Sequence, residues 1–225
     1  MNIQQIRPNE LINDFLFRLG NPTGDGGYAV PYNVMKQSDI LYSYGVGDNS
    51  TFENHYTSIT GKPAHLYDHT VEGSQSGYGN HTFHKEGLSG LDEGITNNFL
   101  YHLKENGDEH KNVLLKIDVE GAEYEWIRNT DINELSKRVS CLVIEFHNAN
   151  AYMSGSLDRI LDKYNVAHWH CNNFGGIINH FPEVPEITFL SKSIPVGEYV
   201  KDKQYPIIDL DIPNNGMKDS YYWKY

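Results

Sequence analysis

Two short apolar segments, each closed by an acidic residue, constrain the fold of this chain more than any other feature of its sequence. VLLKID covers residues 113–118 and CLVIEF covers residues 141–146, so Asp118 and Glu145 follow runs of mostly apolar residues. Such runs, without alternation of polar and apolar residues, are typical of parallel strands that are covered on both faces. Because parallel strands need crossover connections, usually helices, these segments predict an α/β fold.

The rest of the chain supplies further strands and the helices between them. The other predicted strands are Tyr28–Val30, Ile40–Val46 and Ala64–Tyr67. The predicted helices are Asn9–Leu19, Leu91–Leu103, Ala122–Ile127 with a continuation toward Leu135, and Ser156–Tyr164. VAHWH, a polar CNNFGG turn and ITFLS follow between residues 166 and 191. They predict a final antiparallel hairpin beside a mostly parallel central sheet.

Residues 1–192 are expected to form one domain with a short N-terminal helix, and residues 193–225 an irregular C-terminal arm. Pro195, Pro206 and Pro213 interrupt the arm, which ends in the aromatic residues of YYWKY. A segment of this kind is expected to pack on the same domain or on a neighbouring subunit. The second case would make the protein a homo-oligomer.

Charge and composition exclude several classes of protein. Thirty acidic and 18 basic residues give a net charge of −12, which argues against binding nucleic acid through its phosphates. Cys141 and Cys171 are too few for a disulfide scaffold, and Cys141 is predicted to be a core residue. The N-terminus lacks the features of a signal peptide, and no apolar stretch approaches the ~18–20 residues of a membrane span. We therefore expect a soluble, cytoplasmic protein.

A glycine turn and a later acidic residue indicate a nucleotide-like ligand. LYSYGVGDNSTFE, residues 41–53, runs from a strand into Gly45 and Gly47, where the backbone can turn sharply and approach a ligand. Asp68 ends the next strand, where a carboxylate can accept both ribose hydroxyls. Each feature alone also fits an ordinary turn, but their order is the one that adenosine-containing cofactors require. Neither the GxGxxG fingerprint nor a P-loop GK[ST] motif is present.

The most specific segment is KIDVEGAEYEWI, residues 116–127. A buried strand delivers Asp118 to the ligand edge, Gly121 permits a tight turn, and a helix begins with Glu120 and Glu123 near its positive end. With LVIEFH at residues 142–147, this segment resembles the FkbM-type family of S-adenosylmethionine-dependent methyltransferases. The resemblance spans about residues 18–190, and its other segments are DGGY (25–28), YSYGVG (42–47), YDHT (67–70), HKEGLSG (84–90) and HCNN (170–173).

The resemblance implies a Rossmann-like class I methyltransferase fold. It also implies transfer of a methyl group from S-adenosyl-L-methionine to an oxygen, often a hydroxyl of a sugar, a glycan intermediate or another metabolite. The commonest loop of such enzymes has an acid where this chain has Tyr44. The candidates for binding the amine of the donor are therefore Asp48, Glu53 and Asp25. The residues expected to bind the cofactor are Tyr44, Gly45, Gly47, Asp48, Glu53, Asp68 and His69, with Gly87 and Leu88 lining the adenine.

Asp118, Glu145 and His147 are the candidate catalytic residues. The acids close adjacent strands, and His147 lies two residues beyond Glu145, on the same side of an extended chain. Two carboxylates and an imidazole could ligate Mg²⁺ or Mn²⁺, and the cation would acidify an acceptor hydroxyl. The alternative is metal-free, with His147 as general base and Asp118 or Glu145 orienting it.

Other histidines and other functions remain as alternatives. His168 and His170 alternate and point to one face, where a partly buried, hydrogen-bonded pair is favoured over a metal site. His170 is the second functional candidate, because it adjoins the polar Asn172 and Asn173. A nucleotide-sugar oxidoreductase is disfavoured by the missing GxGxxG. A non-catalytic module that binds an adenosine ligand is the remaining alternative.

Overall fold

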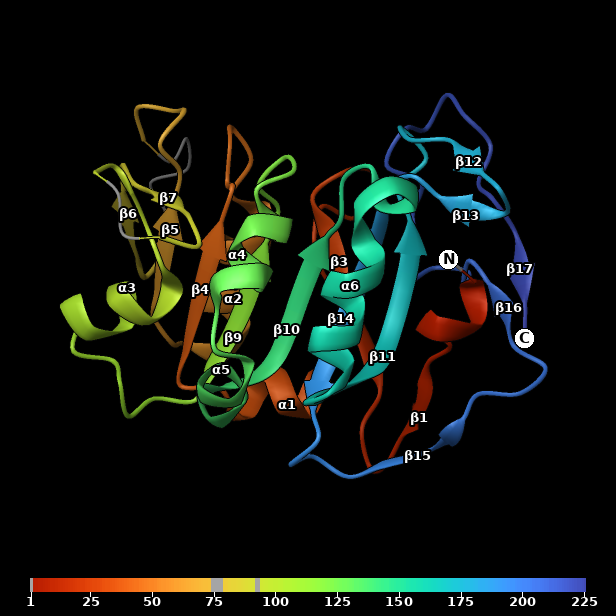
Figure 1. Ribbon diagram of the computed structural model, residues 1–225, viewed down its shortest axis with the longest axis horizontal. Coiled ribbons are helices and arrows are strands. Elements are labelled where there is room, and N and C mark those ends of the chain that lie inside the picture. The colour runs from red at the N-terminus through yellow and green to blue at the C-terminus, as the bar shows by residue number, and fades with distance from the viewer. Residues whose placement is uncertain (1, 74–78, 92–93) are drawn as a thin grey trace.

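The computed structural model describes residues 2–73, 79–91 and 94–225, and a seven-stranded sheet forms its centre (Figure 1). The strand order is β11-β14-β10-β9-β4-β5-β6. The strands are β4 (Ile40–Tyr44), β5 (Ala64–Tyr67), β6 (His81–His84), β9 (Val113–Ile117), β10 (Val139–Glu145), β11 (Tyr164–Cys171) and β14 (Pro185–Ser191). From β10 to β6 each strand is parallel to its neighbour, so their carboxyl ends share one edge. This confirms the predicted α/β class with a mostly parallel sheet.

Strand β14 lies between β10 and β11 and runs antiparallel to both. The connection from β11 to β14 contains a small antiparallel pair, β12 (Ile177–Ile178) and β13 (Phe181–Pro182). In the register of these strands, Glu186 of β14 is the partner of Glu145 on one side and of His170 on the other. Polar residues therefore lie next to one another across the sheet near its ligand edge.

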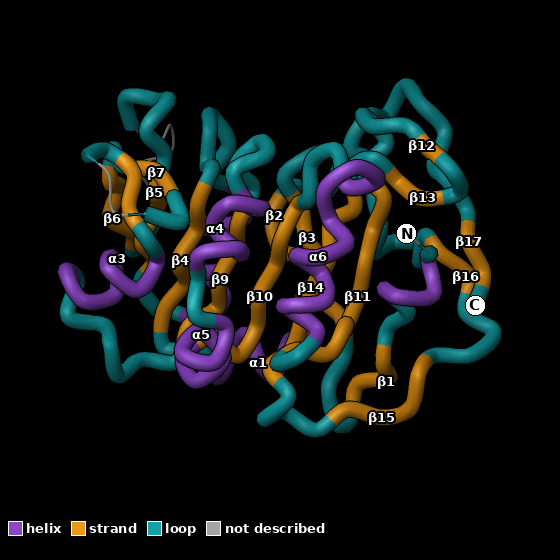
Figure 2. The backbone as a smooth tube through the Cα atoms, in the orientation of Figure 1, coloured by secondary structure: helices purple, strands orange, loops and turns teal. Residues whose placement is uncertain are grey.

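Helices cover both faces of the sheet. Helices α3 (Phe99–Glu105), α4 (Glu123–Asn129), α5 (Ile132–Arg138) and α6 (Ala149–Leu161) lie on the face turned toward the viewer in Figures 1 and 2. The other face carries α1 (Tyr32–Gln37), α2 (Thr51–Thr60) and the hairpin of β2 (Leu16–Gly20) and β3 (Gly27–Pro31). A short parallel pair, β7 (Gly87–Leu88) and β8 (Thr96–Asn97), follows β6.

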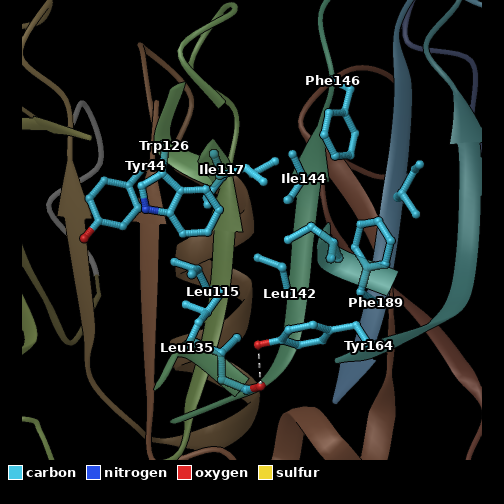
Figure 3. Close-up of a cluster of buried hydrophobic side chains, with 14 of the residues drawn as sticks. Tyr44, Leu115, Ile117, Trp126, Leu135, Leu142, Ile144, Phe146, Tyr164 and Phe189 are labelled. Atoms are coloured by element: carbon cyan, nitrogen blue, oxygen red, sulfur yellow. Dashed lines mark hydrogen bonds between the residues drawn. The ribbon is translucent and has the colours of Figure 1, made fainter. Parts of the chain in front are cut away.

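Apolar side chains fill the layer between the sheet and helices α4, α5 and α6 (Figure 3). Leu115, Leu142 and Ile144 point into this layer, where Trp126 of α4 is also fully buried. Burying one leucine or isoleucine side chain stabilises a protein by roughly 1.5–3 kcal/mol. This core holds the ends of β9 and β10 at fixed positions. In the apolar cluster on the other face of the sheet, Cys141 is fully buried and free, as predicted for a core residue.

The predicted helix at Asn9–Leu19 is wrong. The chain forms strands β1 (Asn9–Leu11) and β2 there, with Asn13 between them at a left-handed φ of 56°. Strand β2 pairs with β3 over its whole length. Pairing with a strand further along the chain outweighs the local apolar spacing, and Phe15 from that spacing is 55% exposed. The first residues contain only a short 3-10 helix, Ile3–Ile6.

Three other predicted helices differ in extent. The helix predicted at Leu91–Leu103 is confined to α3, because β8 precedes it; residues 92–93 lie outside the described part. The helix predicted after Gly121 divides into α4 and α5, and the side chain of Asp131 caps α5. The helix predicted at Ser156–Tyr164 corresponds to α6, which begins earlier, at Ala149, and ends at Leu161. Tyr164, the last residue of the predicted helix, is the first residue of β11. Within the described ranges, no helix is long and apolar enough to cross a membrane.

The C-terminal arm contacts the domain that carries the sheet. Strand β15 (Val196–Tyr199) pairs with β1, and β16 (Gln204–Tyr205) pairs with β17 (Trp223–Lys224). The ring of Trp223 packs against Trp169 of β11, with ring centroids 4.8 Å apart. In Figure 1 the arm lies beyond β11, next to the N-terminal residues.

Candidate active site

A cavity of about 500 Å³ opens at the carboxyl ends of β4, β5 and β9. Cavities of this size hold small molecules, and open α/β sheets bind their ligands at this edge. Eight residues predicted from the sequence to form the site line this cavity: Gly45, Gly47, Asp48, Asp68, His69, Gly87, Leu88 and Asp118. Asp25, the third candidate for the amine of the donor, also lines it.

The glycine turn after β4 brings the backbone of three strand ends together. Gly45 has a φ of 75°, and a Cβ atom at this position would lie 1.5 Å from the carbonyl oxygen of Asp118. The N–H of Gly45 donates to the carbonyl of Tyr67 at 3.0 Å, and the N–H of Asp118 donates to the carbonyl of Tyr44 at 3.1 Å. Only glycine therefore fits at position 45.

Asp68 fixes the next turn and lines the cavity. Its Oδ2 accepts the N–H of Gly47 at 2.8 Å, and its Oδ1 accepts the N–H and the hydroxyl of Thr70 at 2.8 and 2.6 Å. Burial raises the pKa of Asp68, but the hydrogen bonds from Thr70 and Gly47 outweigh burial, so the pKa lies below its ordinary value. The carboxylate is therefore charged, and its remaining lone pairs can accept hydroxyl groups of a ligand.

Two predicted cofactor residues, Tyr44 and Glu53, do not line the cavity. Tyr44 is fully buried against Tyr67 and His102, and its hydroxyl lies 2.9 Å from Nδ1 of His102. Glu53 of α2 is 1% exposed and accepts the hydroxyl of Ser43 at 2.5 Å. These side chains do not reach the cavity, because Tyr44 points into the layer of α3 and Glu53 points into the interior beneath α2.

Asp118, Glu145 and His147 come together beside the cavity, at the ends of β9 and β10. Nε2 of His147 lies 3.6 Å from Oε1 of Glu145 and 4.0 Å from Oδ1 of Asp118. One potential ligand atom from each residue lies within 4.8 Å of the other two. Glu120 places another carboxylate oxygen 3.3 Å from the same imidazole nitrogen. The cluster can bind a cation, or it can use the imidazole as a base between acids.

Tyr28 and Asn172, to which the sequence analysis assigned no role, hold these carboxylates in place. The hydroxyl of Tyr28 lies 3.0 Å from Oδ2 of Asp118 and 2.9 Å from Oε2 of Glu145. The amide of Asn172 donates to Oε1 of Glu145 at 2.9 Å. The available signal was their presence in the DGGY and HCNN segments. Spacing alone could not reveal them, since Tyr28 is 117 residues from Glu145 along the chain.

The backbone of His147 is fixed by residues at the start of α4. Its N–H donates to Oε1 of Glu123 at 2.7 Å, and its carbonyl accepts the hydroxyl of Tyr124 at 2.5 Å. Glu123 is fully buried, and its other oxygen accepts the N–H of Gly121 at 2.8 Å. Glu123 thus joins the turn after β9 to the turn after β10, which gives the second acid of VEGAE a structural role.

Burial and neighbouring charges shift the pKa values of this cluster. Burial, together with the charge of Asp118, raises the pKa of Glu145 to about 8. Burial lowers the pKa of His147, but Glu123 and Glu145 outweigh burial and raise it to about 9. Shifts of this size are typical of functional sites. At neutral pH, His147 must therefore lose a proton before it can act as a base.

His168 and His170 are both hydrogen-bonded, and they are buried rather than partly buried as predicted. Nε2 of His168 lies 2.7 Å from Oδ1 of Asp211, and Nε2 of His170 lies 3.1 Å from Oδ1 of Asn214. Both partners belong to the C-terminal arm. The amide of Asn214 also donates to Asp25 at 2.7 Å, so the arm reaches a residue of the cavity wall.

A mostly parallel sheet with helices on both faces and a cavity at its carboxyl edge is the arrangement of Rossmann-like α/β proteins. Residues 17–183 match the family described as the Methyltransferase FkbM domain. The chain therefore belongs to the FkbM methyltransferase family, as the sequence resemblance implies.

No curated protein matches the sequence. Among solved structures, the chain is similar to a "Putative riboflavin biosynthesis protein" from Shewanella sp. PV-4, with 13% sequence identity. The similarity covers 71% of this chain and 77% of that chain, with a TM-score of 0.27, and it carries no argument about fold or function.

The residues of the site fit the groups that the family and the sequence suggest. S-adenosylmethionine is the cofactor suggested by the family, and the cavity offers a glycine turn, the charged Asp68 and about 500 Å³ of space. Oδ1 of Asp118 and Oε1 of Glu145 are hard oxygen donors beside the imidazole of His147. This donor set suits Mg²⁺ or Mn²⁺.

Proposed function

We propose that this protein is an S-adenosylmethionine-dependent O-methyltransferase that acts on a hydroxyl of a sugar, a glycan or a related metabolite. The position of Asp118 carries the proposal. This residue lines the cavity and also lies 4.0 Å from His147. A donor in the cavity and an acceptor beside His147 would therefore meet at one point.

On the donor side, the chain has to hold and align the cofactor. When bound, the cofactor supplies a methyl group on a sulfonium, ready for in-line displacement by an acceptor oxygen. Asp68 would accept the ribose hydroxyls, and Gly87 and Leu88 would line the adenine. Alignment of donor and acceptor can supply much of the rate acceleration in such a displacement.

On the acceptor side, the chain has to remove a proton from a hydroxyl whose pKa is far above 7. In the metal-free form of the proposal, His147 takes this proton, with Asp118 and Glu145 orienting the imidazole. In the metal-dependent form, the three residues hold Mg²⁺ or Mn²⁺, which would lower the pKa of the hydroxyl. Treatment with EDTA distinguishes the two: loss of transfer that either cation restores supports the second form, and unchanged transfer supports the first.

Exposed aromatic rings near His147 support a sugar as acceptor. Tyr152 is 65% exposed and packs on Tyr124, whose hydroxyl binds the carbonyl of His147. Phe174 is 56% exposed, and its N–H donates to Asn172, the partner of Glu145. Amphipathic sugar rings can lie flat on such faces, while their hydroxyls reach polar groups.

Two experiments test the proposal. The first measures thermal unfolding in the presence of S-adenosylhomocysteine or NAD⁺. The second measures transfer of a labelled methyl group to a panel of sugars and nucleotide sugars. We expect S-adenosylhomocysteine, but not NAD⁺, to raise the unfolding temperature, and we expect at least one sugar to become labelled. A shift with NAD⁺ only would favour the oxidoreductase. S-adenosylhomocysteine binding without transfer to any sugar would favour a non-catalytic module, and no shift with either ligand would contradict the proposal.

A further inference from the structure

Lys116 is a buried cation at the wall of the cavity to which no function has been assigned above. It lies on β9 between Leu115 and Ile117, and its side chain is only 5% exposed. Its ammonium lies 3.4 Å from the carbonyl oxygen of Gly45 and 3.5 Å from Oδ2 of Asp118. Both distances are at the long end of the range for hydrogen bonds and ion pairs.

This ammonium has capacity for a further acceptor. A lysine ammonium carries three N–H donors. It donates to the carbonyl of Gly45, pairs with Oδ2 of Asp118, which also accepts the hydroxyl of Tyr28, and lies 5.2 Å from the centre of the Tyr28 ring. Burial lowers the pKa of Lys116, but the charges of Asp118, Glu53 and Glu145 outweigh burial and raise it, so the ammonium stays charged. The third N–H of this charged donor is therefore available to an anionic group of a ligand in the cavity.

The charges around the cavity match those of the donor. Five carboxylates line the cavity, and among its described lining residues Lys116 carries the only ammonium or guanidinium group. The carboxylates belong to Asp25, Asp48, Asp68, Asp118 and Glu120. S-adenosylmethionine has two positive groups, its sulfonium and its α-ammonium, and one negative group, its α-carboxylate. A wall of many acids with one buried lysine complements this pattern.

We propose that Lys116 binds the α-carboxylate of the donor and thereby selects ligands that carry a complete amino-acid end. This inference rests on the proposed function and adds a specificity-determining residue to it. The carboxylate would lie beside the Gly45 turn, where the carbonyl of Gly45 already orients the ammonium. The α-ammonium of the donor would then lie near the acids of the cavity wall, Asp25 and Asp48 among them.

Three ligands that differ only at the amino-acid end test this assignment by isothermal titration. S-adenosylhomocysteine has the complete end, S-adenosyl-3-thiopropylamine lacks the carboxylate, and 5′-methylthioadenosine lacks the whole end. We expect the native protein to bind the first ligand at least tenfold more tightly than the second. Lys116→Met should weaken the binding of S-adenosylhomocysteine about 10–100-fold, the range for hydrogen bonds to charged groups. It should change the affinities for the other two ligands less than about threefold.

Two further variants complete the design. Lys116→Arg keeps a cation and should retain part of the preference for the carboxylate. Lys137→Met removes an exposed lysine of α5 and should change none of the three affinities. Because 5′-methylthioadenosine needs the same adenosine site, its binding to Lys116→Met shows that this variant is folded.

The outcomes separate this inference from the proposed function. If Lys116→Met weakens all three ligands equally, Lys116 organises the loop rather than binding the carboxylate, and the inference is overturned while the proposed function stands. The same holds if the native protein does not distinguish S-adenosylhomocysteine from the decarboxylated ligand, a result that needs no variant. If the native protein binds none of the three, the proposed function fails and the inference fails with it.

Discussion

The proposed donor side and the proposed acceptor side of the cavity are assembled in different ways. The donor side is built from turns at residues 45–48 and 68–70 and from the short strand β7, which expose backbone groups and the carboxylate of Asp68 to the cavity. The acceptor side gathers side chains from distant segments: Tyr28, Asp118, Glu145, His147 and Asn172. Local turns determine the first, and long-range packing determines the second. Substitutions on the donor side should therefore change binding, whereas substitutions on the acceptor side should change turnover.

The largest expected effect separates the two sides. His147→Ala should lower the rate of methyl transfer about 10²–10⁴-fold, the contribution of a general base, and leave the affinity for S-adenosylhomocysteine unchanged. Single-turnover transfer and isothermal titration measure the two quantities. His110→Ala, an exposed histidine before β9, is the matched control and should change neither. An active His147→Ala enzyme would refute the assignment of the acceptor side.

The second prediction concerns the donor side. Asp68→Ala should weaken the binding of S-adenosylhomocysteine about 10–100-fold, because the ribose loses a charged acceptor and the N–H of Gly47 loses its partner. The rate at saturating donor should change much less than with His147→Ala. Asp68→Asn, which keeps the size of the side chain, should give an intermediate affinity. Native affinity in Asp68→Ala would show that the ribose lies elsewhere.

A third prediction tests whether the contact of the C-terminal arm with β11 stabilises the protein. Asp211→Ala leaves the buried His168 without its hydrogen-bond partner and should lower the free energy of unfolding by about 1–3 kcal/mol. Urea denaturation measures this change, with the exposed Asp219→Ala of the same arm as control. Equal stabilities of the two variants would mean that this contact with the arm contributes nothing measurable.

The last prediction concerns the pH dependence of stability. The pKa of Glu145 is raised from 4.5 to about 8 in the folded protein, so the folded state binds more protons than the unfolded state between these values. The stabilisation is complete below about pH 4.5 and is lost as the pH rises through about 8. Glu145→Gln should therefore flatten the fall in unfolding temperature between pH 5 and 8, whereas the exposed Glu134→Gln should not. Parallel curves for Glu145→Gln and the native protein would rule out a buried, protonated Glu145.

The same difference between the two sides decides what the sequence can predict. The strands before Asp118 and Glu145 are predictable because burial on both faces leaves an apolar run, and Gly45 and Asp68 are predictable because each ends such a strand. Tyr28 and Asn172 are not, because their partners are brought close only by the folded sheet. For the same reason the segment Asn9–Leu19 misleads: its apolar spacing suits a helix, but its pairing partner β3 lies further along the chain.

Exposure is the other property that spacing does not reveal. Glu53 and Tyr44 lie within or next to the glycine turn along the chain, yet the fold buries both side chains away from the cavity. Lys116 shows the opposite case. In the sequence it interrupts an apolar strand, and in the structure it is the cation of the cavity wall.

A crystal structure of the protein with S-adenosylhomocysteine tests the central claim most directly, because it locates the donor relative to both sides of the cavity. We expect the ribose hydroxyls within hydrogen-bond distance of Asp68, and the sulfur atom turned toward Asp118 and His147. A ligand whose ribose lies away from Asp68, or whose sulfur points away from His147, would contradict the claim that donor and acceptor meet at Asp118.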